Sequence, residues 1–245
     1  MSYTKNIRSD MMKFQKEMTL GEIVSTFPGS EKILKKYDID YCCGGHRVVR
    51  EVTSEQNIDV NDLLSKLEAA YEVVMKYGEE KVDWVHAPID HLVEHILQAH
   101  HAFLHSNLGY ISELTTKILR VHGEHHPELL EVFQTFHQLK MELEAHLIKE
   151  ETVQYPAIKK YIETNNLGDL NKAVKVIDEL ENEHTFAGDC LKQLRKISGN
   201  YEVPADGCST FLKTYEMLEL LESNTFTHIH LENNILFGRL KELKQ

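Results

Sequence analysis

The chain has 245 residues, of which 42% are hydrophobic and 27% charged, and its net charge is −12 with histidine neutral. This length suits one large domain or a small domain attached to a larger one, and the strong negative charge disfavours nucleic acid as a partner. No stretch approaches the ~18 uninterrupted apolar residues that a membrane span needs, and residues 1–14 lack the apolar core of a signal peptide. We therefore expect a cytoplasmic protein without a nucleic-acid or membrane partner.

The first part of the chain predicts a small helical domain. Residues 1–17 are expected to form a flexible tail, and residues 18–78 to form the domain itself. Thr19 and Asp59 have the side chains that cap helix N-termini, and Pro28 can end the first helix. Helices are expected over residues 20–27, 30–39 and 60–78.

Two adjacent cysteines, Cys42 and Cys43, lie inside this domain. A disulfide between neighbouring residues closes a strained ring, so the pair is a poor structural crosslink. In a reducing cytosol, redox or metal chemistry is favoured instead. The flexible Gly44-Gly45 backbone and a nearby helix N-terminus are expected to lower the pKa of these thiols. We interpret Cys42 and Cys43 as candidates for redox or iron handling; the alternative is a tight turn in which they only pack.

The rest of the chain predicts an antiparallel four-helix bundle over residues 89–245, after a linker over residues 79–88. Apolar residues recur at helical spacing, and short turns separate the segments. The turn after the first helix contains His122, His125 and His126, which are expected to be solvated. Cys190 and Cys208 are expected to share no role. The four helices are expected over residues 89–120, 128–161, 170–197 and 210–243.

A histidine-glutamate pattern occurs twice, in HLIKEETVQYP (146–156) and HIHLENNILFG (228–238). Residues four apart lie about 40° apart on one helix face, so each histidine and its glutamate point the same way. Both pairs, His146 with Glu150 and His228 with Glu232, share a stripe with core leucines. An ionised carboxylate on a core stripe needs a partner, and a metal ion would also engage the histidine. His230, in contrast, is expected to face the polar side.

The other two long helices each offer an inward histidine. His184 lies on the apolar stripe of the third helix. On the first helix, periodicity slightly prefers His100 over His101 and leaves both open. Together the four helices would present four histidines and two glutamates. If both glutamates bridge, two metal ions with open positions result, and nitrogen and oxygen ligands suit iron or manganese better than structural zinc.

The order His-x-x-x-Glu differs from the Glu-x-x-His of ferritin-like bundles and resembles the hemerythrin-like fold. The stretches KYDIDYCCGG, HHAFL, HLIKEE, ENEH and HIHLENNILF, in this order, resemble the repair of iron centres family. The resemblance covers nearly the whole chain beyond residue 17. It implies an all-α protein, with a hemerythrin-like antiparallel four-helix bundle preceded by a small helical N-terminal domain.

The resemblance also implies a ligand set for two iron ions, bridged by both glutamates and by an oxo or hydroxo group. It selects His101 on the first helix, with His100 kept as the alternative. Two departures stand out: VQYP and LFG replace the family's LFP, at positions expected to close helices, and His105 replaces a common arginine. His91, His95, His105 and His137 are expected to face solvent or to support ligands. The implied ligands are His101, His146, Glu150, His184, His228 and Glu232.

The implied function is restoration of iron–sulfur clusters damaged by nitrosative or oxidative stress, by iron donation, by nitric oxide reduction, or by both. The expected partners are damaged iron–sulfur proteins and small molecules such as nitric oxide or dioxygen, with a possible homodimer. An enzyme activity, nitric oxide reductase, is left open. The alternative is a hemerythrin-like protein that binds or senses dioxygen or nitric oxide without repair activity.

Overall fold

The computed structural model describes residues 14–77 and 82–244, which divide into two compact units between Asp83 and Trp84. Within these ranges the only β-type pairing is one bridge between Thr19 and Val48, so the predicted all-α class is confirmed. No helix in the described part of the chain combines the length and apolar character needed to span a bilayer.

The N-terminal unit is built from short helices around a small apolar core. Its first helix begins with a capping box, in which the Glu22 amide donates to Thr19 Oγ1 at 3.2 Å and the Thr19 amide donates to Glu22 Oε2 at 2.7 Å. The Thr19 cap and the end of the helix before Pro28 therefore agree with the sequence. The helices are α1 (Leu20–Thr26), α2 (Glu31–Lys36), α3 (Val49–Glu55) and α4 (Val60–Tyr77).

Two features of this unit differ from the sequence-based predictions. Helix α3 was not predicted; it is short and has no side-chain N-cap, so it lacks the start signal that identified α1. The predicted tail also extends too far. Phe14 is only 4% exposed, and its ring centroid lies 5.5 Å from that of Tyr71 and 6.1 Å from that of Phe27. Residues 14–17 thus belong to the unit, and the rest of the predicted tail lies outside the described residues.

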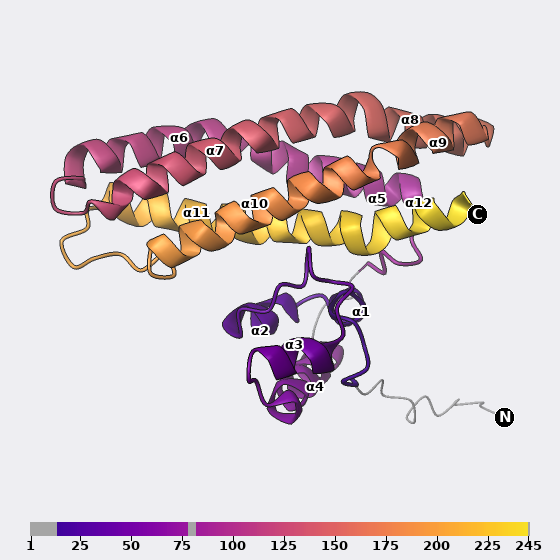
Figure 1. Ribbon diagram of the computed structural model, residues 1–245, viewed down its shortest axis with the longest axis horizontal. Coiled ribbons are helices and arrows are strands. Elements are labelled where there is room, and N and C mark those ends of the chain that lie inside the picture. The colour runs from indigo at the N-terminus through magenta and orange to yellow at the C-terminus, as the bar shows by residue number, and fades with distance from the viewer. Residues whose placement is uncertain (1–13, 78–81, 245) are drawn as a thin grey trace. The chain divides into compact units, whose positions relative to one another are not determined.

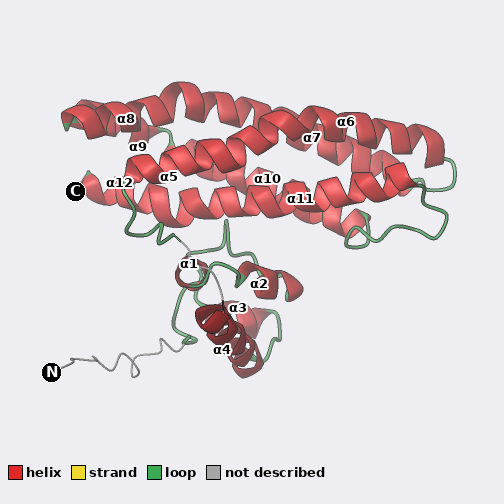
Figure 2. Ribbon diagram, turned by 180° about the vertical axis from the view of Figure 1, so that it is seen from behind, coloured by secondary structure: helices red, strands yellow, loops and turns green. Residues whose placement is uncertain are grey.

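The second unit is the four-helix bundle (Figures 1 and 2). The long helices α6, α7, α10 and α11 pack as a ring in which α6 contacts α7 and α11, and α10 contacts α7 and α11. At three junctions, α5 to α6, α7 to α8 and α11 to α12, one helix continues into the next through a π-helical turn, labelled η. The elements are α5 (Ile89–His95), η1 (Ile96–His101), α6 (Ala102–His122), α7 (Glu128–Lys149), η2 (Glu150–Gln154), α8 (Tyr155–Thr164), α9 (Leu167–Lys175), α10 (Ile177–Ile197), α11 (Ser209–Leu231), η3 (Glu232–Leu236) and α12 (Phe237–Leu243).

Three expectations for the bundle helices need correction. The predicted third helix is two helices, α9 and α10, which meet at Val176. Pro156 and Gly238 do not close helices, because α8 continues to Thr164 and α12 to Leu243. Pro156 is tolerated because it lies at the start of α8, where its missing N–H interrupts no regular helical hydrogen bond.

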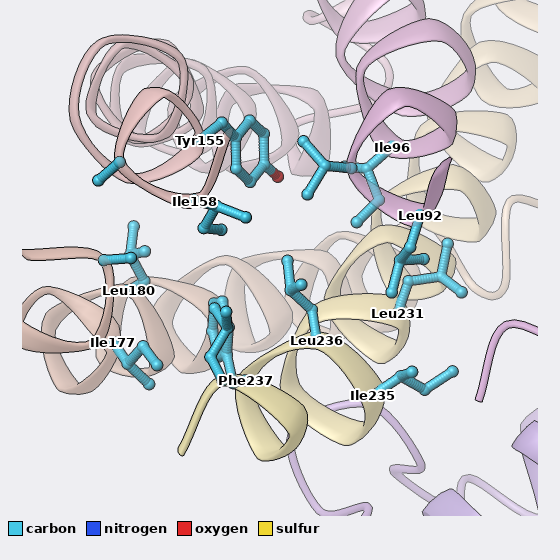
Figure 3. Packing of buried hydrophobic residues seen from close by; sticks show 14 of the residues in the cluster. Leu92, Ile96, Tyr155, Ile158, Ile177, Leu180, Leu231, Ile235, Leu236 and Phe237 are labelled. Atoms are coloured by element: carbon cyan, nitrogen blue, oxygen red, sulfur yellow. The ribbon is translucent and has the colours of Figure 1, made fainter. Parts of the chain in front are cut away.

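One end of the bundle is held by a buried apolar cluster that joins α5, α8, α9, α10 and the C-terminal helix (Figure 3). Trp84, placed in the predicted linker, packs against this cluster and stacks on His95 with a ring separation of 4.3 Å. Tyr155 is the polar member of the labelled side chains, and its hydroxyl connects the apolar cluster to the carboxylates described next.

Candidate metal centre

Each of the three π-helical turns begins or ends at a predicted ligand. η1 ends at His101, η2 begins at Glu150 and η3 begins at Glu232. In a regular helix, residues five apart diverge by about 140°. The extra residue in a π-helical turn returns Tyr155 to the face of Glu150, and π-helical turns of this kind occur frequently at functional sites. The aromatic five places after each glutamate in the repeated motif is the sequence trace of these turns.

The structure gathers five of the predicted ligands into one cluster. Each offers one ligand atom, and these atoms all lie within 4.8 Å of one another; the five are buried and are His146, Glu150, His184, His228 and Glu232. The sixth, His101, places its Nε2 3.1 Å from Glu150 Oε2. All six side chains come from the positions that the sequence predicted, and their assignment as metal ligands stays a prediction.

Glu150 supplies the observation that tests whether the site suits a metal. Its side chain is 0% exposed, and neither carboxylate oxygen has a hydrogen-bond partner among the described residues. Its oxygens lie 3.1 Å from the Nε2 atoms of His101 and His146, within ion-pair distance but outside hydrogen-bond geometry. A buried carboxylate in this state is costly unless a cation, either a protonated imidazole or a metal ion, lies beside it. The donor set of imidazole nitrogens and carboxylate oxygens fits iron.

The imidazoles are oriented by partners on their outer nitrogens. The Nδ1 of His101 lies 2.8 Å from Glu151 Oε1, and that of His146 lies 2.9 Å from Glu183 Oε2. A carboxylate at Nδ1 keeps the proton there and turns the Nε2 lone pair inward, as metal-binding histidines require. Lys149 forms an ion pair with Glu183.

Burial raises the pKa of Glu183, but His146 and Lys149 lower it more, to about 2. Glu183 is therefore a charged partner at neutral pH. Glu183 was not predicted to contribute to the site. Its role follows from the contact between neighbouring helices, which periodicity along one helix cannot reveal.

Tyr155 was likewise not predicted to contribute to the site. Its hydroxyl donates to Glu232 Oε1 at 2.6 Å and lies 3.4 Å from His101 Nε2. Burial, followed by the charges of Glu150 and Glu232, raises the pKa of Tyr155 well above its usual value, so the hydroxyl stays protonated. The second carboxylate is thus satisfied by a hydrogen bond that the first one lacks.

In the metal-free cluster, the negative charge of the carboxylates is balanced by protonated histidine. Burial lowers the pKa of His146, but Glu150 and Glu183 outweigh it and raise the pKa to about 10. Burial raises the pKa of Glu232, yet His228 and His184 bring it well below its usual value. A metal ion that enters the cluster therefore competes with a bound proton.

The structure separates the two candidate histidines of the first helix. His100 turns its Nδ1 toward Asn224 Oδ1 at 3.3 Å, and its Nε2 has no hydrogen-bond partner among the described residues. His101 instead faces Glu150. The expected orientation of His230 is wrong: the residue is 4% exposed, because α11 is buried around most of its circumference at this level.

Two of the other bystander histidines of the bundle, His105 and His137, also have partners. His105 is exposed, and its Nε2 lies 2.8 Å from Glu151 Oε1, so it shares the carboxylate that orients His101. His137 lies 2.9 Å from the hydroxyl of Ser112. His105 therefore adds a protonatable group at the outer edge of the site.

The two predicted thiols of the N-terminal unit form a second small cluster, with Asp40. The Sγ atoms of Cys42 and Cys43 lie 3.7 Å apart, and Asp40 Oδ1 accepts both of their backbone amides. The expected lowering of the thiol pKa is wrong for Cys42. Its burial, together with Cys43 and Asp40, raises the pKa well above the usual value. A role in redox or iron handling stays a prediction.

Both units match families of known proteins. A family model described as the hemerythrin HHE cation binding domain matches residues 91–240, and one described as a domain of unknown function (DUF542) matches residues 16–71. The chain is similar to the iron-sulfur cluster repair protein YtfE of Escherichia coli O157:H7, with 30% identity over 228 residues that cover 91% of this chain and 96% of the relative. It is also similar to the iron-sulfur cluster repair protein ScdA of Staphylococcus haemolyticus strain JCSC1435, with 28% identity over 223 residues that cover 91% and 97%. The chain therefore belongs to the repair of iron centres family, and its bundle is a hemerythrin domain.

Proposed function

We propose that this chain is a di-iron protein that restores damaged iron–sulfur clusters. The observation that carries the proposal is the fully buried Glu150 carboxylate, which lacks a hydrogen-bond partner among the described residues and lies within 3.1 Å of two imidazole nitrogens. The names of the relatives ScdA and YtfE supply the repair function. The residues proposed to hold the two irons are His101, His146, Glu150, His184, His228 and Glu232.

The residues around the cluster would position its ligands. Glu151, Glu183 and Asn233 hold the outer nitrogens of His101, His146 and His184 at 2.8–2.9 Å. This fixes each ring so that its inner nitrogen is available to a metal. Tyr155 restricts Glu232 by its hydrogen bond and leaves Glu150 free to bridge.

A cavity of about 560 Å³ lies beside residues that contact this cluster. Its walls come from α5, η1, η2 and α8, and they include Glu151 and Tyr155. Glu151 contacts His101, and Tyr155 contacts Glu232, so a small molecule in the cavity would lie one side chain away from the ligands. The mixture of apolar and acidic walls suits a small neutral molecule or an iron ion.

Bound iron would supply the redox and ligand-exchange chemistry, and two uses follow. The site could donate iron to a damaged cluster, or it could reduce nitric oxide that would otherwise damage clusters. In either case Tyr155 can hold a proton beside Glu232, because its pKa is raised by burial. The thiols of Cys42 and Cys43 are proposed to contribute to redox or iron handling, and damaged iron–sulfur proteins are the proposed partners.

The test is a repair assay on a nitric-oxide-damaged iron–sulfur enzyme with the iron-loaded full-length chain, the iron-depleted chain and His146→Ala. We expect activity to return only with the iron-loaded chain. Equal recovery with iron-depleted protein would contradict the proposal. Recovery by neither form, combined with a stable and reversible dioxygen adduct, would favour the alternative of a dioxygen-binding protein.

The two uses of iron can be separated in the same assay. Iron donation transfers iron from the chain to the enzyme, which isotope-labelled iron reports directly. Nitric oxide reduction leaves the label in the chain and produces nitrous oxide.

A further inference from the structure

A cysteine and a histidine meet at one end of the bundle, in a place that the proposed metal centre does not use. Cys208 is the N-cap residue of α11, and His122 is the last residue of α6. Figure 1 shows the connection before α11 and the turn after α6 at the same end of the bundle. His122 Nε2 lies 3.2 Å from Cys208 Sγ, and the thiol is exposed to solvent.

The histidine is held in place by aromatic packing. His122 and His126 both contact the edge or face of Phe211, with ring centroids at 5.4 and 5.6 Å. His126 is fixed in turn, because its Nε2 lies 3.1 Å from both carboxylate oxygens of Asp206 and its Nδ1 lies 3.1 Å from Glu128 Oε1. The turn that was expected to be only solvated is therefore an ordered arrangement around Cys208.

Two features of this arrangement favour the thiolate form of Cys208. The contact with His122, and then the backbone amides of Phe211 and Thr210 at the start of α11, lower its pKa to about 7. Thiols at helix N-termini and beside histidines are activated in the same way. Cys190 is the contrasting case, since burial raises its pKa.

We propose that Cys208 and His122 form a nucleophilic pair in which Cys208 is oxidised to a sulfenic acid by a small, uncharged hydroperoxide. The Cys208 sulfur attacks one peroxide oxygen, so that an S–O bond forms and the O–O bond breaks. Sulfur loses two electrons and the peroxide gains them. The proton on His122 Nε2 passes to the leaving oxygen, which departs as water or an alcohol.

The charges around Cys208 and His122 determine which oxidants can approach the thiol. Asp206 and Glu128 both contact His126, and within the described residues no lysine or arginine forms a hydrogen bond or ion pair with Cys208, His122 or His126. An anionic disulfide would be repelled there, whereas a neutral hydroperoxide would not. The reaction also needs no second cysteine at the site, in keeping with four free cysteines in the chain.

The first test measures how alkylation of Cys208 by iodoacetamide, a neutral reagent, depends on pH in the full-length protein. His122 contacts the thiol, and His126, whose ring lies beside that of His122, carries Asp206 and Glu128. We expect a midpoint near pH 7 in the original protein and above pH 8 in His122→Gln, because an unassisted thiol titrates at about 8.5. His125→Gln, an exposed histidine in the same turn, is the matched control and should keep the midpoint near 7.

The second test adds hydrogen peroxide with a sulfenic-acid trap and locates the label by mass spectrometry. At pH 7 we expect Cys208 to be labelled before Cys190, and roughly tenfold more slowly in His122→Gln, as the thiolate fraction falls from about one half to a few per cent. The difference in labelling rate between the original protein and His122→Gln should disappear above pH 9. Circular dichroism shows whether the variant is folded.

Three results would overturn the proposal: a midpoint near 8.5 in the original protein, equal labelling of His122→Gln at pH 7, or faster reaction with an anionic disulfide than with peroxide. Iron content is measured in parallel. Because the pair lies apart from the six proposed ligands, failure here would leave the di-iron proposal intact, and failure of iron loading would leave this one intact.

Discussion

The two copies of the histidine-glutamate motif share a spacing but differ in their surroundings. The residue after each glutamate holds the lone histidine of another helix: Glu151 contacts His101, and Asn233 contacts His184. The first of these partners is charged and the second is neutral. The repeat therefore encodes two equivalent pairs of proposed ligands, and the neighbouring positions make the two halves of the site unequal.

The aromatic residues nine places after each motif histidine also make the two halves of the site unequal. Tyr155 donates a hydrogen bond to Glu232, whereas Phe237, its counterpart, has no hydroxyl and stacks against His184 with the ring planes 5° apart. Glu232 is consequently satisfied in the metal-free protein and Glu150 is not.

The largest effect should come from removing either carboxylate. Glu150→Gln and Glu232→Gln should each lose most of the bound iron, because both glutamates are proposed bridges. Metal analysis of protein purified from iron-replete cells measures this. Glu144→Gln, on the exposed side of α7, is the control and should keep its iron. Full iron content in either bridge variant would remove that residue from the ligand set.

The same two variants should differ in metal-free stability. Glu232 accepts the Tyr155 hydroxyl and lies 3.0 Å from His228, so Glu232→Gln breaks a buried, paired charge and should cost about 3 kcal/mol. Glu150→Gln should cost less, because its carboxylate has no such hydrogen bonds. Denaturant unfolding of metal-depleted protein compares them. Equal losses would show that the asymmetry has no energetic consequence.

Changing Glu151 or Asn233, which contact the outer Nδ1 atoms of His101 and His184, should have an intermediate effect on iron affinity. Glu151→Gln removes the charge behind His101 and makes the first repeat resemble the second, so iron affinity should fall by about 10- to 100-fold. Asn233→Asp makes the opposite change and should strengthen binding. Competition with a chelator measures both. Opposite signs are required; a loss in both variants would indicate simple structural damage.

Tyr155→Phe removes the hydroxyl, so that this position resembles Phe237, its counterpart in the second copy of the motif. Loss of a hydrogen bond to a buried carboxylate should destabilise the metal-free protein by about 1.5–3 kcal/mol. Tyr161→Phe, elsewhere on α8, is the matched control. The loss from Tyr155→Phe should largely disappear in a Glu232→Gln background, and an additive double variant would argue against the contact.

The metal-free protein should also show a pH dependence of its stability. The pKa of His146 is raised to about 10 from the usual 6.5 or so, chiefly by Glu150 and Glu183 against the effect of burial. Its contribution is therefore complete below about pH 6.5 and is lost as pH rises toward 10. Thermal unfolding from pH 7 to 10 should show a decline that is weaker in His146→Gln. A flat profile in the original protein would contradict this assignment.

Much of the site could be predicted because its information is local. His146 and Glu150 are four residues apart on one helix, so periodicity alone puts both on the core face. The Thr19 cap was readable for the same reason. Glu183, Tyr155 and Cys208 were missed because their partners lie on other helices. The π-helical turns were missed because their sequence trace, the aromatic five places after each motif glutamate, does not by itself distinguish a π-helical turn from a regular helix. His230 was misplaced because a helical wheel assumes that one side of a helix faces solvent.

The central claim is that six side chains hold two iron ions in one cluster. Mössbauer spectroscopy combined with iron quantification, on protein purified without added metal, tests it most directly. We expect two irons per chain and two quadrupole doublets of comparable area, because Glu151 and Asn233 make the two positions inequivalent. One iron per chain, or a spectrum from isolated mononuclear iron, would contradict it.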